Sequence, residues 1–105
     1  MCIRDRIIYN VTITLDPAIE EDWLRWMKTV HVPDVMNTGM FLKNRILRVL
    51  DKRETGPSFA IQYECKDLDA LNEYQDKFAA ALQKDHTERY QGQFAAFRTL
   101  LEVLE

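Results

Sequence analysis

Apolar and polar side chains alternate from Tyr9 to Leu15 in the first patterned stretch of the chain, residues 7–15. The apolar members fill the odd positions from Tyr9 onward, a period of two that predicts a half-buried strand. Asp16 and Pro17 follow as a helix cap and first helical residue, and apolar residues then recur every three or four positions. We therefore predict a helix over 16–31, which ends or kinks before the next proline and leaves room for one further short turn.

The rest of the chain repeats these two patterns. A strand is predicted at 41–50, where apolar residues fall on both parities, so we expect a bulge or burial on two sides. The alternation over 58–65 is clean, and a helical apolar stripe follows over 67–91. The last predicted strand, 94–104, again carries apolar residues on both parities.

The predicted element order is β-α-β-β-α-β. This order is typical of the ferredoxin-like α+β fold, a four-stranded antiparallel sheet with two helices on one face. A chain of 105 residues has the length of one domain, and we assign that domain to residues 7–105. The residues before it, 1–6, fall outside the pattern and are interpreted as an extension that is not native to the fold or is disordered.

Two helices can cover only one face of such a sheet, so the other face needs an explanation. The strands at 7–15 and 58–65 place polar residues there, and the other two strands add large apolar ones. This mixture predicts a homodimer formed through the sheet, with the two sheets facing or extending one another. On the parity we assume, this face holds Asn10, Thr12, Thr14, Gln62, Glu64, Leu42, Ile46, Arg48, Arg98, Leu100 and Leu104.

Composition excludes several classes of protein. The apolar fraction of 47% and charged fraction of 30% are those of a globular domain. A net charge of −3 argues against non-specific nucleic-acid binding, and no apolar run approaches the length of a membrane span. Cys2 and Cys65 are isolated from one another, and no secretion signal precedes the first strand, so we expect free thiols and a cytoplasmic protein.

Several motifs resemble a known group of proteins. The segments Trp23-Leu24-Arg25-Trp26-Met27, His31-Val32-Pro33-Asp34-Val35 and Phe94-Ala95-Ala96-Phe97-Arg98-Thr99 are similar to a family of short bacterial proteins catalogued as a domain of unknown function, numbered 4286. The first two of these segments, together with Tyr9-Asn10-Val11-Thr12, also resemble the dimeric α/β-barrel superfamily, whose members include monooxygenases, haem proteins, isomerases and plain ligand binders. The resemblance implies a dimeric ferredoxin-like fold from Ile7 onward and leaves the activity open.

His31 is the main candidate for chemistry. It lies at the predicted end of the first helix, where the helix dipole would raise the pKa of the imidazole. Its side chain then acts either as a general base or ligand contact, or as a structural helix-end group. Two histidines without metal-ligand spacing predict no metal site, and we expect His86 on a solvated helix face. No cofactor is predicted.

Polar and aromatic residues supply the candidate ligand contacts. A strand arginine that projects into a barrel interior needs an anionic partner, which is either a ligand or Glu64. Trp26 is either a pocket residue or part of the core. The candidate ligand-binding residues are Asn10, Trp26, Arg48, Gln62, Glu64 and Arg98.

Two functions from different classes remain. The first is a small homodimeric protein that binds a small ligand between the sheet and the helices. The second is a cofactor-independent enzyme, similar to a monooxygenase or an isomerase, that acts on a small apolar or aromatic substrate. A filled interior would favour the first function, and a cavity of several hundred Å³, on the order of a typical ligand pocket, with converging polar groups would favour the second.

Overall fold

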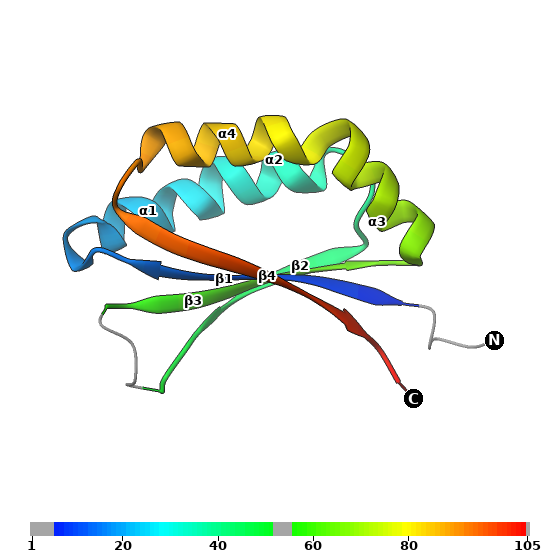
Figure 1. Cartoon of the computed structure of the whole chain (residues 1–105), viewed down its shortest axis with the longest axis horizontal. Helices are drawn as coiled ribbons and strands as arrows, with labels where there is room; N and C mark the ends of the chain where they lie inside the picture. The colour runs from blue at the N-terminus through cyan, green and yellow to red at the C-terminus, as the bar shows by residue number, and fades with distance from the viewer. Residues whose placement is uncertain (1–5, 52–55, 105) are drawn as a thin grey trace.

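Four antiparallel strands form one sheet in the order β2-β3-β1-β4 (Figure 1). The computed structural model describes residues 6–51 and 56–104. The predicted extension therefore lies outside the described residues, apart from Arg6. The backbone carbonyl of Arg6 accepts from the Val103 N–H at 2.9 Å, so the sheet hydrogen bonding already includes residue 6. The strands are β1 Ile7–Leu15, β2 Lys43–Arg48, β3 Ser58–Cys65 and β4 Phe94–Glu102.

Two helical segments cover the same face of this sheet, as Figure 1 shows. Each segment contains a π-helical stretch in its middle. The first consists of η2 Pro17–Ile19, α1 Glu20–Trp26, the π-helical η3 Met27–His31 and α2 Val32–Met36. The second consists of α3 Leu68–Tyr74, the π-helical η4 Gln75–Ala79 and α4 Ala80–Arg89.

The first helical segment continues through Pro33 and does not end at His31. The Val32 N–H bonds to the Met27 carbonyl five residues earlier, which is the wider π-helical turn. This turn gives space to the proline ring, which would clash with a carbonyl in a regular helix, and Pro33 has no N–H to leave unpaired. The prediction of a helix end at residue 31 was wrong, whereas helical backbone after Pro33 is confirmed through Met36.

Side-chain caps and glycines set the helix boundaries, as the sequence indicated. Asp16 Oδ1 accepts from the Ala18 N–H at 3.0 Å, and Asp67 Oδ1 accepts from the Ala70 N–H at 2.9 Å. Gly39, with φ of +79°, follows the first segment, and its left-handed backbone is one that other residues rarely adopt.

The pairing register shows which side chains share a face. Asn10 lies opposite Gln62 and Thr99, and these point away from the helices, on what we call the open face. The assumed parity of β2 and β4 was wrong by one residue, because Ile46 lies opposite the buried Ile61 and Arg98 opposite Val11. Ile46, Arg48, Arg98 and Leu100 therefore face the helices, Leu42 precedes β2 and Leu104 follows β4. The open face instead carries Lys43, Arg45, Leu47, Ala95, Phe97, Thr99 and Leu101.

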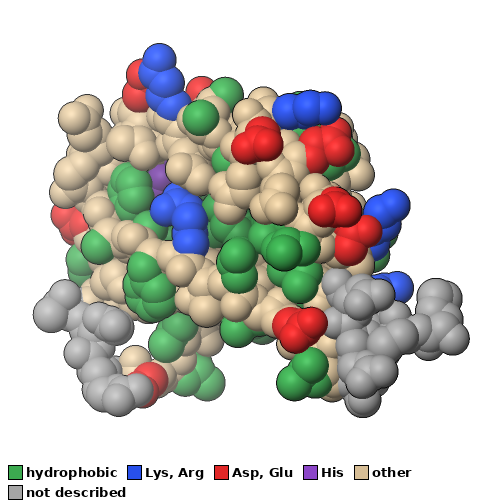
Figure 2. Space-filling model, turned by 45° about the vertical axis from the view of Figure 1, so that its right-hand side comes forward, with side chains coloured by type: hydrophobic (Ala, Val, Ile, Leu, Met, Phe, Trp, Pro, Cys, Tyr) green, Lys and Arg blue, Asp and Glu red, His purple; other side chains and the backbone are tan. Residues whose placement is uncertain are grey.

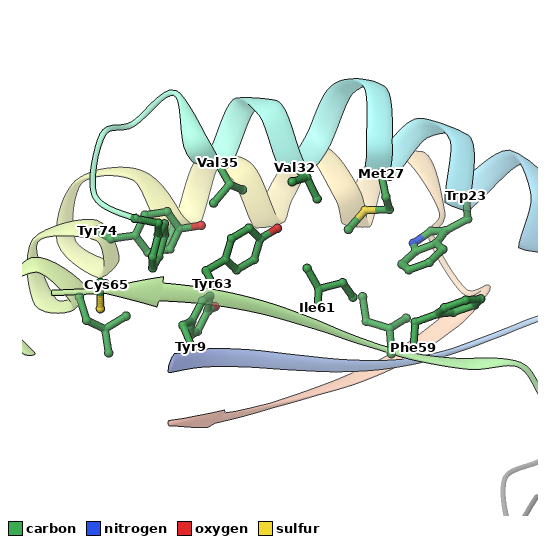
Figure 3. Packing of buried hydrophobic residues seen from close by; sticks show 14 of the residues in the cluster. Tyr9, Trp23, Met27, Val32, Val35, Phe59, Ile61, Tyr63, Cys65 and Tyr74 are labelled. Carbon is green, nitrogen blue, oxygen red and sulfur yellow. The ribbon is translucent and has the colours of Figure 1, made fainter. Parts of the chain in front are cut away.

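The core fills the space between the sheet and the helices (Figure 3). Its largest members come from both layers: Trp23 and Met27 point down from the first helical segment, and Phe59 and Ile61 point up from β3. Tyr9, Tyr63 and Tyr74 form an aromatic cluster at the other end, with Tyr9 and Tyr63 ring centroids 6.2 Å apart. Each buried aromatic ring removes a large apolar area from water, so these rings contribute strongly to the stability of this small domain.

Candidate functional site

A small pocket lies between the sheet and the two helical segments; we call it the helix-side pocket. Its volume is about 40 Å³, room for a few water molecules. Figure 3 shows the hydroxyl groups of Tyr63 and Tyr74 pointing into the layer between sheet and helices. The pocket is lined by Tyr9, Val11, Ile13, Met27, His31, Val35, Ile61, Tyr63, Tyr74, Leu82, Gln83, His86, Thr87 and Arg98.

His31 is the last residue of η3, and its side chain lines this pocket. Its ring centroid lies 5.2 Å from that of Trp26 and 5.8 Å from that of His86. Burial lowers the pKa of His31 and outweighs the opposite effect of Asp34 and Asp85. The predicted raised pKa was therefore wrong, because the helix does not end at His31 and desolvation dominates.

His86 faces the same pocket from α4 and is 6% exposed, so the expectation of a solvated position was wrong. Its Nε2 accepts a hydrogen bond from the indole N–H of Trp23 at 2.8 Å. The ring also meets Phe94 edge-on, with centroids 4.5 Å apart. Burial, followed by the charges of His31 and Arg98, lowers the pKa of His86 to about 4. Both histidines are consequently neutral at pH 7.

Arg98 reaches the pocket from β4 and contacts the Tyr9 hydroxyl. The Arg98 Nε donates to this oxygen at 3.0 Å, and Gln83 Nε2 donates to it at 3.4 Å. Burial raises the pKa values of Tyr63 and Tyr74, so both hydroxyls stay protonated. No Asp or Glu side chain lines the pocket, and within the described ranges Arg98 forms no ion pair.

Two other predicted contacts lie beside the pocket and do not line it. Trp26 contacts both histidine rings and stacks under the Arg89 guanidinium at 5.3 Å. Arg48 pairs with Glu20 at 2.8 Å and lies over the Phe59 ring. Arg48 therefore has an internal carboxylate partner, although this partner is Glu20 and not Glu64.

Three predicted contacts lie on the open face, on the opposite side of the sheet from His31. Asn10 donates to Thr12 Oγ1 at 3.1 Å and accepts from Gln62 Nε2 at 3.2 Å. Glu64 pairs with Arg6 at 2.8 Å and with Lys43 at 3.8 Å. The structure thus separates the predicted site residues into three groups, and of these residues His31 and Arg98 meet in the helix-side pocket.

The sequence analysis missed Tyr9, Gln83 and His86 as pocket residues. The sequence did contain a signal that His86 is buried. Tyr74, Phe78 and Leu82 recur every four residues on one apolar face of the helix, and the next position on that face is 86. The charged neighbours Asp85 and Glu88 point elsewhere on the helix and are exposed. No comparable signal marks Gln83, whose partner Tyr9 is 74 residues away.

Other kinds of site find little support. Over the described ranges, no group of three or more His, Cys, Asp or Glu side chains could hold a metal ion. Across those same ranges no helix has the length and hydropathy to cross a bilayer. Cys65 is unpaired and buried, as predicted, and burial raises the pKa of its thiol. The predicted free Cys2 lies outside the described residues.

Comparison with protein families identifies the chain. The model of the family called Domain of unknown function (DUF4286) matches residues 6–104, nearly the whole sequence. The chain belongs to this family. No protein of curated function matches the DUF4286 chain.

Solved structures match the DUF4286 chain over almost its whole length. SnoaB, a cofactor-independent oxygenase from Streptomyces nogalater, has a TM-score of 0.63 and 14% identity, over 96% of this chain and 95% of its own. A dimeric ferredoxin-like protein from an uncultured marine organism has a TM-score of 0.59 and 18% identity, over 95% and 96%. A Nitrosomonas europaea protein proposed to be an antibiotic biosynthesis monooxygenase has a TM-score of 0.71 and 9% identity, over 99% and 95%. These similarities confirm the predicted ferredoxin-like α+β fold.

Proposed function

We propose that this protein is a homodimer that binds a small ligand in the helix-side pocket. One observation carries the proposal: His31, His86 and Arg98 come from three different elements and converge on the same cavity, together with the Tyr9 hydroxyl. Converging polar groups in an otherwise apolar cavity are typical of ligand sites. The proposal places the protein in the cytoplasm, in keeping with the unpaired thiol of Cys65.

The small volume of the pocket supports the binding of a chemical group of only a few atoms. Its volume of about 40 Å³ is far below the roughly 300–1,000 Å³ of pockets that enclose drug-sized ligands. Figure 2 shows a histidine at the molecular surface beside a basic side chain and hydrophobic ones, so the pocket has access from outside. A larger ligand would bind with one group inside and the remainder along the exposed Arg98 and Thr87.

The proposed dimer joins two copies through their open faces. Phe97 is 60% exposed there, and Leu47 and Leu101 are each 40% exposed. The fold similarity to a protein described as dimeric and ferredoxin-like supports a second copy as the occupant of this face.

A fragment screen followed by backbone amide NMR tests the ligand site. Ligands of the helix-side pocket are expected to shift the amide signals of Gln83, Thr87 and Arg98, because these residues line it. The built-in control is the open face, where the side-chain amide signals of Asn10 and Gln62 in the same spectra should not respond, because these side chains hydrogen-bond to one another away from the pocket. Shifts confined to Asn10 and Gln62 would overturn the proposal and move the ligand to the other side of the sheet.

The geometry of His31 favours a second candidate function, a cofactor-independent oxygenase or isomerase. Its imidazole lines the pocket, makes no hydrogen bond to another described residue, and has a lowered pKa, so a free basic nitrogen is available at neutral pH. The fold similarity to the oxygenase SnoaB is compatible with such a reaction. The small cavity volume favours simple binding over this alternative.

Exchange of ligand protons with deuterated water separates the two functions. For a ligand found in the screen, an enzyme should exchange an acidic C–H proton, and His31→Ala should abolish the exchange while binding remains within a few-fold. Trp26→Phe, which keeps His31 and changes only its neighbour, is the matched control. If the unmodified protein binds the ligand without exchanging its proton, the enzyme function is excluded and the ligand-binding function stands.

A further inference from the structure

The hydrogen bond between Trp23 and His86 fixes the tautomer of the histidine. An indole N–H can only donate, so Nε2 of His86, 2.8 Å away, must be the unprotonated, accepting nitrogen. The proton of the neutral ring is therefore on Nδ1. A charged ring would place an N–H of His86 directly against the N–H of Trp23, so this contact also excludes the imidazolium. His86 is thus held as a hydrogen-bond donor through Nδ1.

The Nδ1–H of His86 has no hydrogen-bond acceptor among the described residues. Every fully buried side-chain nitrogen and oxygen in that part of the chain has a partner. Nδ1 is consequently an atom that solvent can reach, although the residue as a whole is only 6% exposed. The cavity that His86 lines is the helix-side pocket, so this donor is available to a molecule in the pocket.

Tyr9 supplies a second donor by the same reasoning. Its hydroxyl oxygen has two acceptor sites, and these are used by Arg98 Nε at 3.0 Å and Gln83 Nε2 at 3.4 Å. The hydroxyl proton therefore remains to be donated, and no described residue accepts it. The guanidinium of Arg98 adds a full positive charge beside this hydroxyl.

Among the side chains that line the pocket none is a carboxylate. Asp34 and Asp85 act on His31 from the helical layer but do not line the cavity. The pocket therefore offers two free donors and a cation without an internal anion. Donors of this kind form their strongest hydrogen bonds with anionic oxygens.

From this arrangement we infer that the ligand presents an anionic oxygen group of carboxylate size, which accepts from His86 Nδ1 and the Tyr9 hydroxyl beside Arg98. Trp23 is the positioning residue, because it holds His86 in the donating tautomer without touching the ligand itself. The inference rests on the proposed function, since it names the chemistry of the ligand that the helix-side pocket takes.

Three isosteric probes test the charge preference: acetate, acetamide and acetamidinium, at equal ionic strength. They have nearly the same size and shape, and each is small enough for the pocket. We expect acetate to shift the Nδ1 signal of His86 and to bind about tenfold more tightly than acetamide, since hydrogen bonds to an ionised acceptor are the stronger ones. Acetamidinium should bind least, because it brings a second cation beside Arg98.

The outcomes separate the inference from the proposed function. If acetamide or acetamidinium binds in the pocket as tightly as acetate, the inference is wrong and the binding function stands. If no probe shifts any pocket signal at concentrations where acetate saturates exposed arginines, both are wrong. Arg25→Gln, which removes an exposed arginine that pairs with Asp22 at 3.9 Å and lies outside the pocket lining, controls for non-specific anion binding.

The positioning role of Trp23 has its own measurement, which needs no ligand. Nitrogen NMR of the free protein should show His86 with a protonated Nδ1 and an unprotonated Nε2. Trp23→Phe removes the donor, so protonated Nε2 should appear and acetate affinity should fall several-fold; Trp26→Phe should change neither. A protonated Nε2 in the unmodified protein would overturn the inference even if Trp23→Phe failed to fold.

Discussion

His86 has two kinds of contact that favour its neutral ring. The first is geometric, since Nε2 accepts from Trp23 and cannot carry a proton at the same time. The second is electrostatic, since burial removes solvation from the charged form and His31 and Arg98 add positive potential. A histidine in this setting behaves as a fixed hydrogen-bond donor at neutral pH and becomes destabilising to the fold only in acid.

This makes the pH dependence of stability a prediction at the residue scale. The folded pKa of His86 is about 4 against an unfolded value of 6.5, so below pH 6.5 the unfolded chain binds the proton more readily. The His86 contribution is full above pH 6.5 and is lost as the pH falls toward 4. The loss approaches about 1.4 kcal/mol per pH unit and reaches at most about 3 kcal/mol.

Urea unfolding of the unmodified protein and of His86→Gln at pH 7.5 and pH 4.5 measures this effect. Glutamine can still accept from Trp23 but does not titrate, so the stability advantage of the unmodified protein at pH 7.5 should shrink by about 2 kcal/mol at pH 4.5. Trp26→Phe is the control, because it changes a ring that contacts His86 but removes no titratable group, so its stability difference should be the same at both pH values. If the free energies of unfolding of the unmodified protein and of His86→Gln differ by the same amount at both pH values, the lowered pKa of His86 is contradicted.

At the scale of elements, the strands and helices could be predicted in kind and order, but the faces of the edge strands could not. β3 lies between two strands, with one face buried, and its alternation is therefore unambiguous. β4 is an edge strand whose two faces carry similar residues: Phe97 and Leu101 on the open face, Leu100 on the other. All three are largely exposed, so hydropathy alone had no basis for choosing the buried parity.

The candidate site could also be predicted only in part from the sequence. His31 and Arg98 stood out as polar groups within patterned elements, and the structure brings both to the helix-side pocket. The partner of His86 could not be found by local pattern, because Trp23 lies 63 residues away and the bond exists only once the two helical segments lie side by side. Tertiary contacts of this kind decide which polar residues become buried donors.

At the scale of the whole molecule, the open face is the surface through which we propose that two copies associate. Two helical segments cover one side of the sheet (Figure 1). The other side presents Phe97 and Leu101 to solvent among polar residues. β4 is also a sheet edge of nine residues, and unpaired strand edges with apolar side chains favour association with another chain. A second copy that covers this surface would bury the largest exposed aromatic ring of the described residues.

The assembly is tested by placing a charge at the centre of this surface. In a symmetric dimer each copy contributes the same residues, so Phe97→Glu brings two carboxylates toward one another and replaces buried ring contacts by like-charge repulsion. We expect light scattering at micromolar concentration to give twice the single-chain mass of 12.4 kDa for the unmodified protein and the single-chain mass for Phe97→Glu. Val30→Glu, which places the same charge at a 40% exposed position on the helical layer, should stay dimeric. A single-chain mass for the unmodified protein would exclude the dimer, and a dimeric Phe97→Glu variant would move the interface away from the open face.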